Sequence, residues 1–397
     1  MDEVRINELI KIYKEGLLED TIPWWQNRFL DFEDGGYLIY RDADGTLLST
    51  DKPVWFLGRI AWMWSRLYNK VEKRQNWLEV AKHGIDFMLK HAFDNDGRMF
   101  FTLTKDGRPL RKRRYLFSEC FGAIALAEYA RAAGSEEMLQ KSKDLFDLII
   151  KYHTTPGLLP PKVIPETRPM KSHGIYMILI SVAQILREVD NAYIYTEVIN
   201  DSIKEIFTNF VKPEKRCLLE NVLADGSFLD IPEGRIVNPG HSIETAWFIM
   251  KEGEYRRDKS LVLKACEVLD WSLDMGWDEK YGGGILYYVD CDKKPPEPIE
   301  HELKLWWPHN EALYSTLLAY YLTKDEKWCN WYERIHKWTF EHFPDKTNGE
   351  WYGYLRRDGT ISSPVKGNIW KGPFHLPRMQ LNCWQLLESM KLENSKV

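Results

Sequence analysis

The stretch Val54–Tyr68, VWFLGRIAWMWSRLY, is apolar on nearly every side when its residues are placed at helical spacing. A helix of this kind is buried on more than one face. The next periodic stretch, Asn76–Lys90, has apolar residues three and four positions apart and charged residues opposite them, which is typical of a helix with one buried side. The two stretches together predict an inner helix covered by an outer one.

The same alternation continues along the chain. The further segments with the inner pattern are Ser118–Ala133, Ser172–Arg187, His241–Met250 and Glu311–Leu322. The further segments with the outer pattern are Glu136–Tyr152, Tyr193–Phe210, Lys259–Leu273 and Lys327–His342.

A glycine followed by aromatic or apolar residues recurs between the helix pairs, with gaps of 57 to 69 residues. Its positions are Gly36, Gly97, Gly157, Gly226, Gly283 and Gly349. A repeat of about 60 residues fits two helices and one long loop. We therefore expect an all-α fold, an (α/α)6 barrel or toroid of about twelve helices, with long loops and short hairpins at one end. The length alone would favour two or three domains, but the repeats predict a single domain over residues 1–397.

Composition limits the classes of partner. Hydrophobic residues make up 44% and charged residues 28% of the chain, as in an ordinary globular protein. The net charge is −5 and the one basic run, Arg111–Arg114, is isolated, so we expect no nucleic-acid partner. The longest uncharged apolar run, Ser172–Leu186, has 15 residues, too few to suggest a membrane span. The six cysteines form no CxxC pair and the N-terminus has no apolar signal core, which predicts reduced thiols in a cytoplasmic protein.

Four of the ten histidines stand in unusual contexts. His173, His241 and His309 lie at the starts of inner helices, and His375 lies between apolar residues flanked by two prolines. We interpret the others as surface or structural residues: His83, His91, His153, His301, His336 and His342. The N-termini of all inner helices lie at one end of a toroid, so the first three should converge. The partial positive charge there disfavours imidazolium, and we expect these histidines to be neutral near pH 7.

Acidic residues share these helix starts, namely Glu119, Glu244 and Glu311. Arg59 lies within the first buried helix, where it needs an acidic partner or a polar ligand. Histidines and glutamates also suit a metal site, although no HExxH motif is present.

Three kinds of site remain open at this point. One is the metal site. A second is a glycosidase pair formed by Glu244 and Glu311, which leaves the histidines unexplained. The third is proton transfer at a carbon beside a carbonyl, with neutral histidines as bases and Arg59 polarising the oxygen. The sequence contains no GxGxxG, Walker loop or nucleophile elbow, the motifs that would favour dinucleotide, phosphoryl or acyl chemistry.

Four motifs, spread over nearly the whole chain, resemble the N-acylglucosamine 2-epimerase family. They are Gly58-Arg59 with Trp62 and Arg66-Leu67-Tyr68, Asn238-Pro239-Gly240-His241 with Glu244, the run KLWWPH from Lys304 to His309 with Glu311, and the run KGPFHLPR from Lys371 to Arg378. The resemblance implies an (α/α)6 barrel that interconverts N-acetyl-D-glucosamine and N-acetyl-D-mannosamine. Cellobiose 2-epimerases and aldose–ketose isomerases of the same superfamily are the alternatives, and a non-enzymatic renin-binding type is a second one.

The resemblance also assigns roles to residues. It implies that His241 and His375 form the acid–base pair. The residues that it implies bind the sugar are Arg59, Glu119, His173, Glu244, Trp307, His309, Glu311 and Arg378. It requires no metal or redox cofactor, and by analogy ATP is an activator that is not consumed. The expected partner is a small amino sugar, and the expected assembly is a homodimer.

Overall fold

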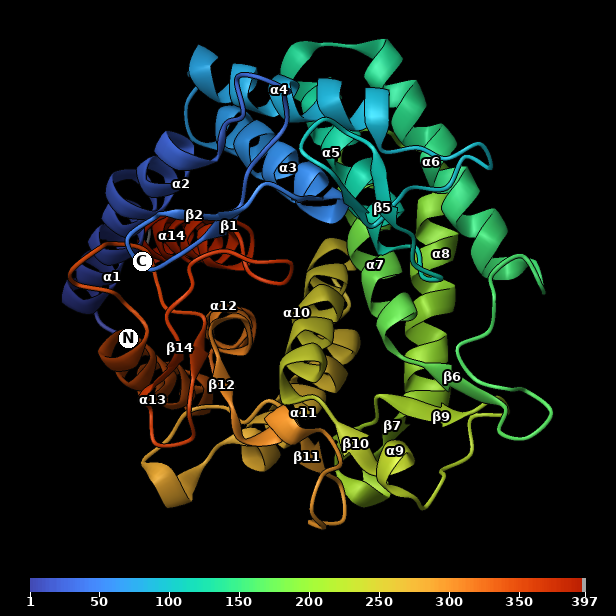
Figure 1. The fold of residues 1–397 in the computed structure, drawn as a ribbon. Helices are drawn as coiled ribbons and strands as arrows, with labels where there is room; N and C mark the ends of the chain where they lie inside the picture. Colours follow the sequence, from blue (N-terminus) through green and yellow to red (C-terminus); the bar gives the residue numbers. More distant parts are fainter. Residues whose placement is uncertain (395–397) are drawn as a thin grey trace.

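The structure is a computed structural model that describes residues 1–394 of the 397. Within that part of the chain, six inner helices surround a central space and outer helices cover them (Figure 1). The inner helices are α3 (Val54–Lys70), α5 (Phe117–Ala133), α7 (Gly174–Arg187), α10 (Pro239–Arg256), α12 (Trp306–Thr323) and α14 (His375–Asn394). The outer helices are α1 (Glu3–Glu15), α4 (Gln75–His91), α6 (Glu136–Thr154), α8 (Tyr193–Glu205), α11 (Lys259–Gly276) and α13 (Glu326–His342).

Shorter helical pieces extend or connect these elements. A π-helical turn, Gly16–Thr21, joins α1 to α2 (Ile22–Phe29), and a second one, Ile206–Phe210, continues α8. The remaining pieces are α9 (Pro232–Arg235) and the 3-10 turns Pro213–Lys215, Glu279–Tyr281 and Ile299–Glu302.

The inner helices pack in chain order, and α14 closes the ring against α3. Gln385 of α14 donates a hydrogen bond to the carbonyl of Lys70 at 3.2 Å, and the rings of Trp62 and Phe374 lie 5.5 Å apart. Contact between α3 and α5 is closest at Gly58, where a Cβ atom would lie 2.5 Å from the backbone carbonyl of Phe121. The predicted barrel of inner and outer helices is therefore confirmed.

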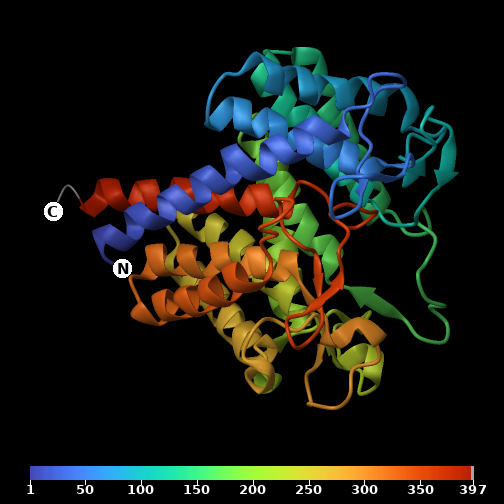
Figure 2. The same ribbon diagram turned by 60° about the vertical axis from the view of Figure 1, so that its left-hand side comes forward.

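Short antiparallel hairpins lie at one end of the barrel, opposite both chain termini (Figure 2). The strands are β1 (Tyr40–Arg41), β2 (Leu47–Ser49), β3 (Lys52–Pro53), β4 (Thr102–Leu103), β5 (Pro109–Arg111), β6 (Met170–Ser172), β7 (Val211–Lys212), β8 (Cys217–Leu218), β9 (Asn221–Leu223), β10 (Ile236–Val237), β11 (Val289–Asp290), β12 (Lys304–Leu305), β13 (Tyr354–Leu355) and β14 (Ile361–Ser363). Four of these strands, β3, β6, β10 and β12, end within a residue or two of the start of an inner helix. The hairpins thus fix where α3, α7, α10 and α12 begin.

Buried lysines hold the loops at this end. Lys52 pairs with Asp31 at 2.8 Å and Lys366 pairs with Asp345 at 2.9 Å, each with almost no exposed surface. Removing one partner of such a pair would leave an uncompensated buried charge, which is strongly destabilising. These pairs therefore favour one loop conformation over others.

The sequence predicted ten helices to within a few residues, except that α10 ends six residues after its predicted end and α12 begins five residues before its predicted start. It did not assign bounds to the sixth pair, α1 and α14. The first is interrupted by a π-helical turn, and the second carries Pro377 in its first turn, so neither shows an unbroken helical period. In the part of the chain that the structure describes, no helix is long and apolar enough to cross a membrane. All six cysteines are free and buried.

Candidate active site

A cavity of about 1480 Å³ lies inside the ring of inner helices. Its lining runs along α3 from Trp55 to Lys70 and along α10 from His241 to Tyr255, which corresponds to about 20 Å at 1.5 Å per residue. At the end that carries the hairpins, both predicted catalytic histidines line the cavity, His241 from the first turn of α10 and His375 from the first residue of α14.

His375 is held by a buried group of opposite charges. Its Nδ1 atom lies 2.7 Å from Oε1 of Glu311. Nη2 of Arg378 donates to the same oxygen at 2.7 Å and to Oε1 of Glu244 at 2.5 Å. The indole of Trp247 donates to the second oxygen of Glu311 at 2.8 Å. Because Nδ1 is engaged, Nε2 is the ring nitrogen left for chemistry.

The surroundings of His375 favour the neutral imidazole. Burial lowers the pKa of His375 well below its ordinary value; Glu244 opposes this effect, and the cations Arg378 and Arg59 add to it. A neutral imidazole in a largely dry site can act as a general base.

His241 has a different electrostatic environment. Its Nδ1 atom lies 3.0 and 3.1 Å from the two oxygens of Glu220, and 30% of its side chain stays accessible. Burial opposes the charged form, but the charge and the hydrogen bond of Glu220 outweigh it, so the pKa of His241 is raised. The contact with Glu220 therefore acts against the neutral form that the helix N-terminus was expected to favour at His241.

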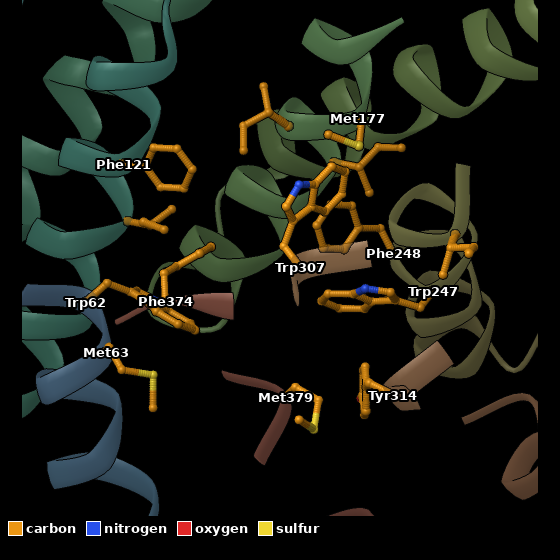
Figure 3. Close-up of a cluster of buried hydrophobic side chains, with 14 of the residues drawn as sticks. Trp62, Met63, Phe121, Met177, Trp247, Phe248, Trp307, Tyr314, Phe374 and Met379 are labelled. Atoms are coloured by element: carbon orange, nitrogen blue, oxygen red, sulfur yellow. The ribbon is translucent and has the colours of Figure 1, made fainter. Parts of the chain in front are cut away.

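The ring of Trp307 lies close to both imidazoles. Its ring centroid is 5.1 Å from that of His241 and 5.6 Å from that of His375. Other aromatic and apolar side chains from several inner helices gather around the same interior, including Trp62, Phe121, Trp247 and Phe374 (Figure 3). Aromatic faces of this kind pack well against the C–H faces of sugars. The predicted place of Trp307 as a wall of the site agrees with this arrangement.

Arg59 lines the cavity without an acidic partner. It is 8% exposed, and no carboxylate lies within ion-pairing distance of it among residues 1–394. Its guanidinium carbon lies 4.1 Å from the ring centroid of Phe121 and 4.4 Å from that of Trp55. Burial lowers the pKa of Arg59 to about 9, although Glu244 opposes the shift. A buried cation held only by aromatic faces is suited to a polar ligand that arrives in the cavity.

His309 and Glu119 do not face the cavity, contrary to expectation. Nδ1 of His309 lies 2.6 Å from the carbonyl of Leu305, and Nε2 accepts from the backbone N–H of Ile285 at 2.8 Å. Oε1 of Glu119 accepts hydrogen bonds from Nε of Arg98 at 2.5 Å and from the backbone N–H of Met99 at 2.9 Å. Both are therefore structural residues that anchor loops.

Helix geometry explains both corrections. Residues two apart on a helix lie on nearly opposite sides, whereas residues four apart share a side. Trp307 lines the cavity, so His309 is turned to the outer ring, where it stacks on Trp338. In the same way Phe117 and Phe121 line the cavity and Glu119, between them, is turned away.

His173 lies behind the cavity wall instead of in it. It is fully buried, and its Nε2 atom lies 2.9 Å from the hydroxyl of Thr245. Its Nδ1 atom is 3.9 Å from Glu220, and burial lowers the pKa of His173 to about 4. His173 and His241 therefore do converge, but through Glu220.

Sequence reasoning missed Glu220, Trp247 and Tyr287. Tyr287 and Trp247 line the cavity, and nothing in their local sequence distinguishes them from core aromatics. Glu220 did carry a signal, because it is a lone carboxylate in the otherwise apolar run CLLENVL.

One group of described residues has the composition of a metal site: Glu244, Glu311 and His375 offer ligand atoms within 4.8 Å of one another. Arg378 already bonds both carboxylates. A metal ion on these three ligands would face that guanidinium, so the donor set fits an organic cation better than a metal. The same ion pair also makes Glu244 and Glu311 unsuitable as a glycosidase pair, since neither is free to act.

The cavity presents the imidazoles of His241 and His375, the guanidinium of Arg59, which has no ion-pair partner among residues 1–394, and several aromatic side chains. These groups can move protons at a carbon and stabilise negative charge on an adjacent oxygen.

Comparisons with known proteins agree with this chemistry. The family model described as N-acylglucosamine 2-epimerase matches residues 35–375. An N-acylglucosamine 2-epimerase from Bos taurus is 32% identical, with 96% of this chain and 93% of that protein covered. A cellobiose 2-epimerase from Dictyoglomus turgidum is 24% identical over 94% of this chain and 98% of its own.

Among solved structures, that of the cellobiose 2-epimerase from Bacillus thermoamylovorans superimposes with a TM-score of 0.83 at 21% identity, covering 96% of this chain and 99% of the other. This likeness shows the fold, and the matches in sequence show the family. The chain belongs to the N-acylglucosamine 2-epimerase family and is a carbohydrate epimerase.

Proposed function

We propose that this protein interconverts N-acetyl-D-glucosamine and N-acetyl-D-mannosamine. The observation that carries the proposal is the pair of imidazoles that line one cavity beside Trp307, each with Nδ1 on a carboxylate and Nε2 left for the substrate. Inversion at one carbon needs a proton to leave on one face and another to arrive on the opposite face. The relatives named N-acylglucosamine 2-epimerase support the choice of an N-acyl sugar.

The reaction begins with the open-chain sugar, whose C1 carbonyl makes the C2 proton weakly acidic. Nε2 of one histidine takes that proton, and the electron pair moves onto O1 as an enolate. Arg59 supplies positive charge for this oxygen in a part of the cavity where it has no other partner. The second histidine gives its proton to C2 from the other side, and the electron pair on O1 returns to the carbonyl. One proton has left C2 and another has been added to it, and no bond between two non-hydrogen atoms has been broken.

The second candidate is an epimerase for disaccharides with a free reducing end. Its support is the volume of the cavity, because about 1480 Å³ is well above the 300–1,000 Å³ typical of pockets for small ligands. The same two histidines would act at C2 of the reducing-end residue. A third, an aldose–ketose isomerase, would return the proton to C1 on the same face and needs only one base.

Deuterium uptake from heavy water distinguishes these candidates. We expect N-acetylglucosamine to gain deuterium at C2 and to yield N-acetylmannosamine, with cellobiose and mannose reacting more slowly. Faster turnover of cellobiose favours the second candidate, and a ketose product favours the third. If no aldose in this panel exchanges its C2 proton, the protein is not a sugar epimerase or isomerase.

Single histidine variants test the two-base mechanism. His241→Asn and His375→Asn should each lose inversion by about 10²–10⁴-fold, the usual contribution of a general acid or base. Each variant should still exchange the C2 proton of one epimer, and the two variants should prefer opposite epimers. His153→Asn, on the outer helix α6, is the matched control and should behave as the unaltered protein. Exchange of the same epimer by both variants would rule out two bases on opposite faces.

A further inference from the structure

Glu220 contacts His241 from the connection between β8 and β9, in the segment that leads into α10. Both of its oxygens are close to Nδ1 of His241, at 3.0 and 3.1 Å, and only 16% of its side chain is exposed. Among residues 1–394 no lysine or arginine lies within ion-pairing distance of it; its ion-pair contacts are His173 and His241. The groups in ion-pair contact with the carboxylate of Glu220 are therefore both imidazoles.

The backbone fixes the position of this carboxylate. The N–H of Glu220 donates to the carbonyl of Ile236 at 3.0 Å, and its carbonyl accepts from the N–H of His173 at 3.0 Å. The helix that carries His241 is anchored as well, because the side chain of Asn238 accepts from the N–H of His241 at 3.0 Å. The carboxylate and the imidazole are thus held from both sides at hydrogen-bond distance, with Nδ1–H as the tautomer that the contact requires.

The second imidazole has the same kind of contact with the opposite electrostatic result. Glu311 touches Nδ1 of His375, but Arg378 bonds the same carboxylate oxygen. The guanidinium offsets the charge of Glu311, whereas no lysine or arginine of residues 1–394 forms an ion pair with Glu220. The two histidines therefore differ in which form their surroundings stabilise. Burial, together with Arg378 and Arg59, favours neutral His375, whereas the contact with Glu220 favours protonated His241.

We propose that Glu220 is a positioning residue that fixes the ring of His241 and keeps this histidine protonated, so that His241 enters the reaction as the acid while His375 enters as the base. The inference rests on the proposed epimerase function. In that cycle Nε2 of His375 takes the C2 proton and Nε2–H of protonated His241 gives its proton to the opposite face. The reverse direction uses the other form of the pair, with the proton on His375 and His241 as the base. One proton is therefore needed on the pair of histidines in either direction, and the carboxylate of Glu220 favours its retention on the enzyme.

Other ionisable groups also face His241 or Glu220, and each packs from a different element. Glu244 lies on the same helix as His241, and His173 immediately precedes α7. His375 and Arg378 lie on α14. The loops over the cavity contribute Lys162, Tyr287, Tyr288 and Glu300. Of the three carboxylates near this ring, those of Glu220, Glu244 and Glu300, only that of Glu220 is within hydrogen-bond distance of His241. The direction of the shift at His241, upward from its ordinary pKa, agrees with that contact.

The variant Glu220→Gln keeps the size of the side chain and removes its charge. Histidine-labelled protein is titrated by NMR, and the His241 signal is assigned by its absence in His241→Asn. We expect the pKa of His241 to fall in Glu220→Gln. The matched control is Glu252→Gln, which removes a buried carboxylate on the same helix that pairs with Arg187 instead, and it should leave His241 unchanged.

Activity supplies the second readout. The alkaline limb of kcat/KM should move to lower pH in Glu220→Gln, so that the loss is about 10²-fold in mildly alkaline buffer, the lower end of an acid–base contribution, and shrinks as the pH falls. A purely structural defect would reduce the rate by the same factor at every pH. Glu220→Asp keeps the charge and should retain a raised pKa at His241, which keeps the test open if Glu220→Gln does not fold.

The outcomes separate this inference from the proposed function. If the His241 signal titrates alike in the unaltered protein and in Glu220→Gln, Glu220 does not set its charge and the inference is overturned. If the unaltered protein exchanges no C2 proton, the epimerase proposal fails, while the titration still decides what Glu220 does to His241. A parallel loss of rate at all pH values with an unchanged His241 also overturns the inference.

Discussion

Arg378→Met tests the electrostatic centre of the site. Arg378 is bonded to Glu244 at 2.5 Å and to Glu311 at 2.7 Å, and the side chains of all three are at most 8% exposed. Methionine fills much of the same space without the charge. The variant leaves two buried carboxylates next to each other with no cation in contact.

The burial of the three side chains determines the expected magnitude. Exposed ion pairs contribute about 0–1 kcal/mol, whereas breaking a buried pair by removing one partner costs about 3–5 kcal/mol. We expect the upper range because one guanidinium serves two carboxylates. The double variant Arg378→Met/Glu244→Gln removes one of the stranded charges and should recover part of the loss, which a double-mutant comparison measures directly.

Urea unfolding at pH 7 gives the free energies for the unaltered protein and the variants. The histidine also responds: Arg378 is one of the cations that lower the pKa of His375, so its loss should raise that pKa and make the imidazole of His375 more basic. A loss of stability below about 1 kcal/mol, with no recovery from Glu244→Gln, would mean that these ion pairs behave as surface pairs. It would refute the argument that Arg378 neutralises two buried carboxylates.

The remaining predictions concern acid stability, metal and assembly. Burial lowers the pKa of His309 to about 3, so between pH 6.5 and 3 the unfolded chain binds a proton that the folded chain does not; the free energy of unfolding should fall as the pH drops through this range and level off below it. His309→Asn should flatten that slope in urea titrations at several pH values, and an unchanged slope contradicts the assignment. Activity should survive EDTA followed by desalting, because Arg378 already provides the cation for Glu244 and Glu311; activity lost and then restored by a divalent ion would support a metal site instead. Light scattering at micromolar concentration should give the mass of a dimer, and a strict monomer would contradict the expected homodimer.

Much of the fold follows from local patterns in the sequence. The stretch Val54–Tyr68 is apolar all round and Asn76–Lys90 on one side only, and helical periodicity is a property of neighbouring residues. The recurring glycines mark the loops because their backbone conformations, such as φ +86° at Gly226, suit glycine better than other residues. Inner and outer helices, and the helix starts that carry the histidines, could therefore be predicted without coordinates.

Only the tertiary structure determined which side of each inner helix faces the cavity. A helix that is apolar all round has no preferred side in its sequence, so Trp307 and His309, or Phe121 and Glu119, are equal candidates until the neighbouring helices are in place. The pairing partners are non-local as well: Arg378 and Glu244 are 134 positions apart, and Glu220 lies 21 positions before His241, in the connection between β8 and β9. The sequence by itself thus determined the barrel and placed the histidines at one end of it. The packing of the helices determined which of those histidines meet the substrate and which carboxylate governs each one, because that depends on the rotation of each helix against its neighbours.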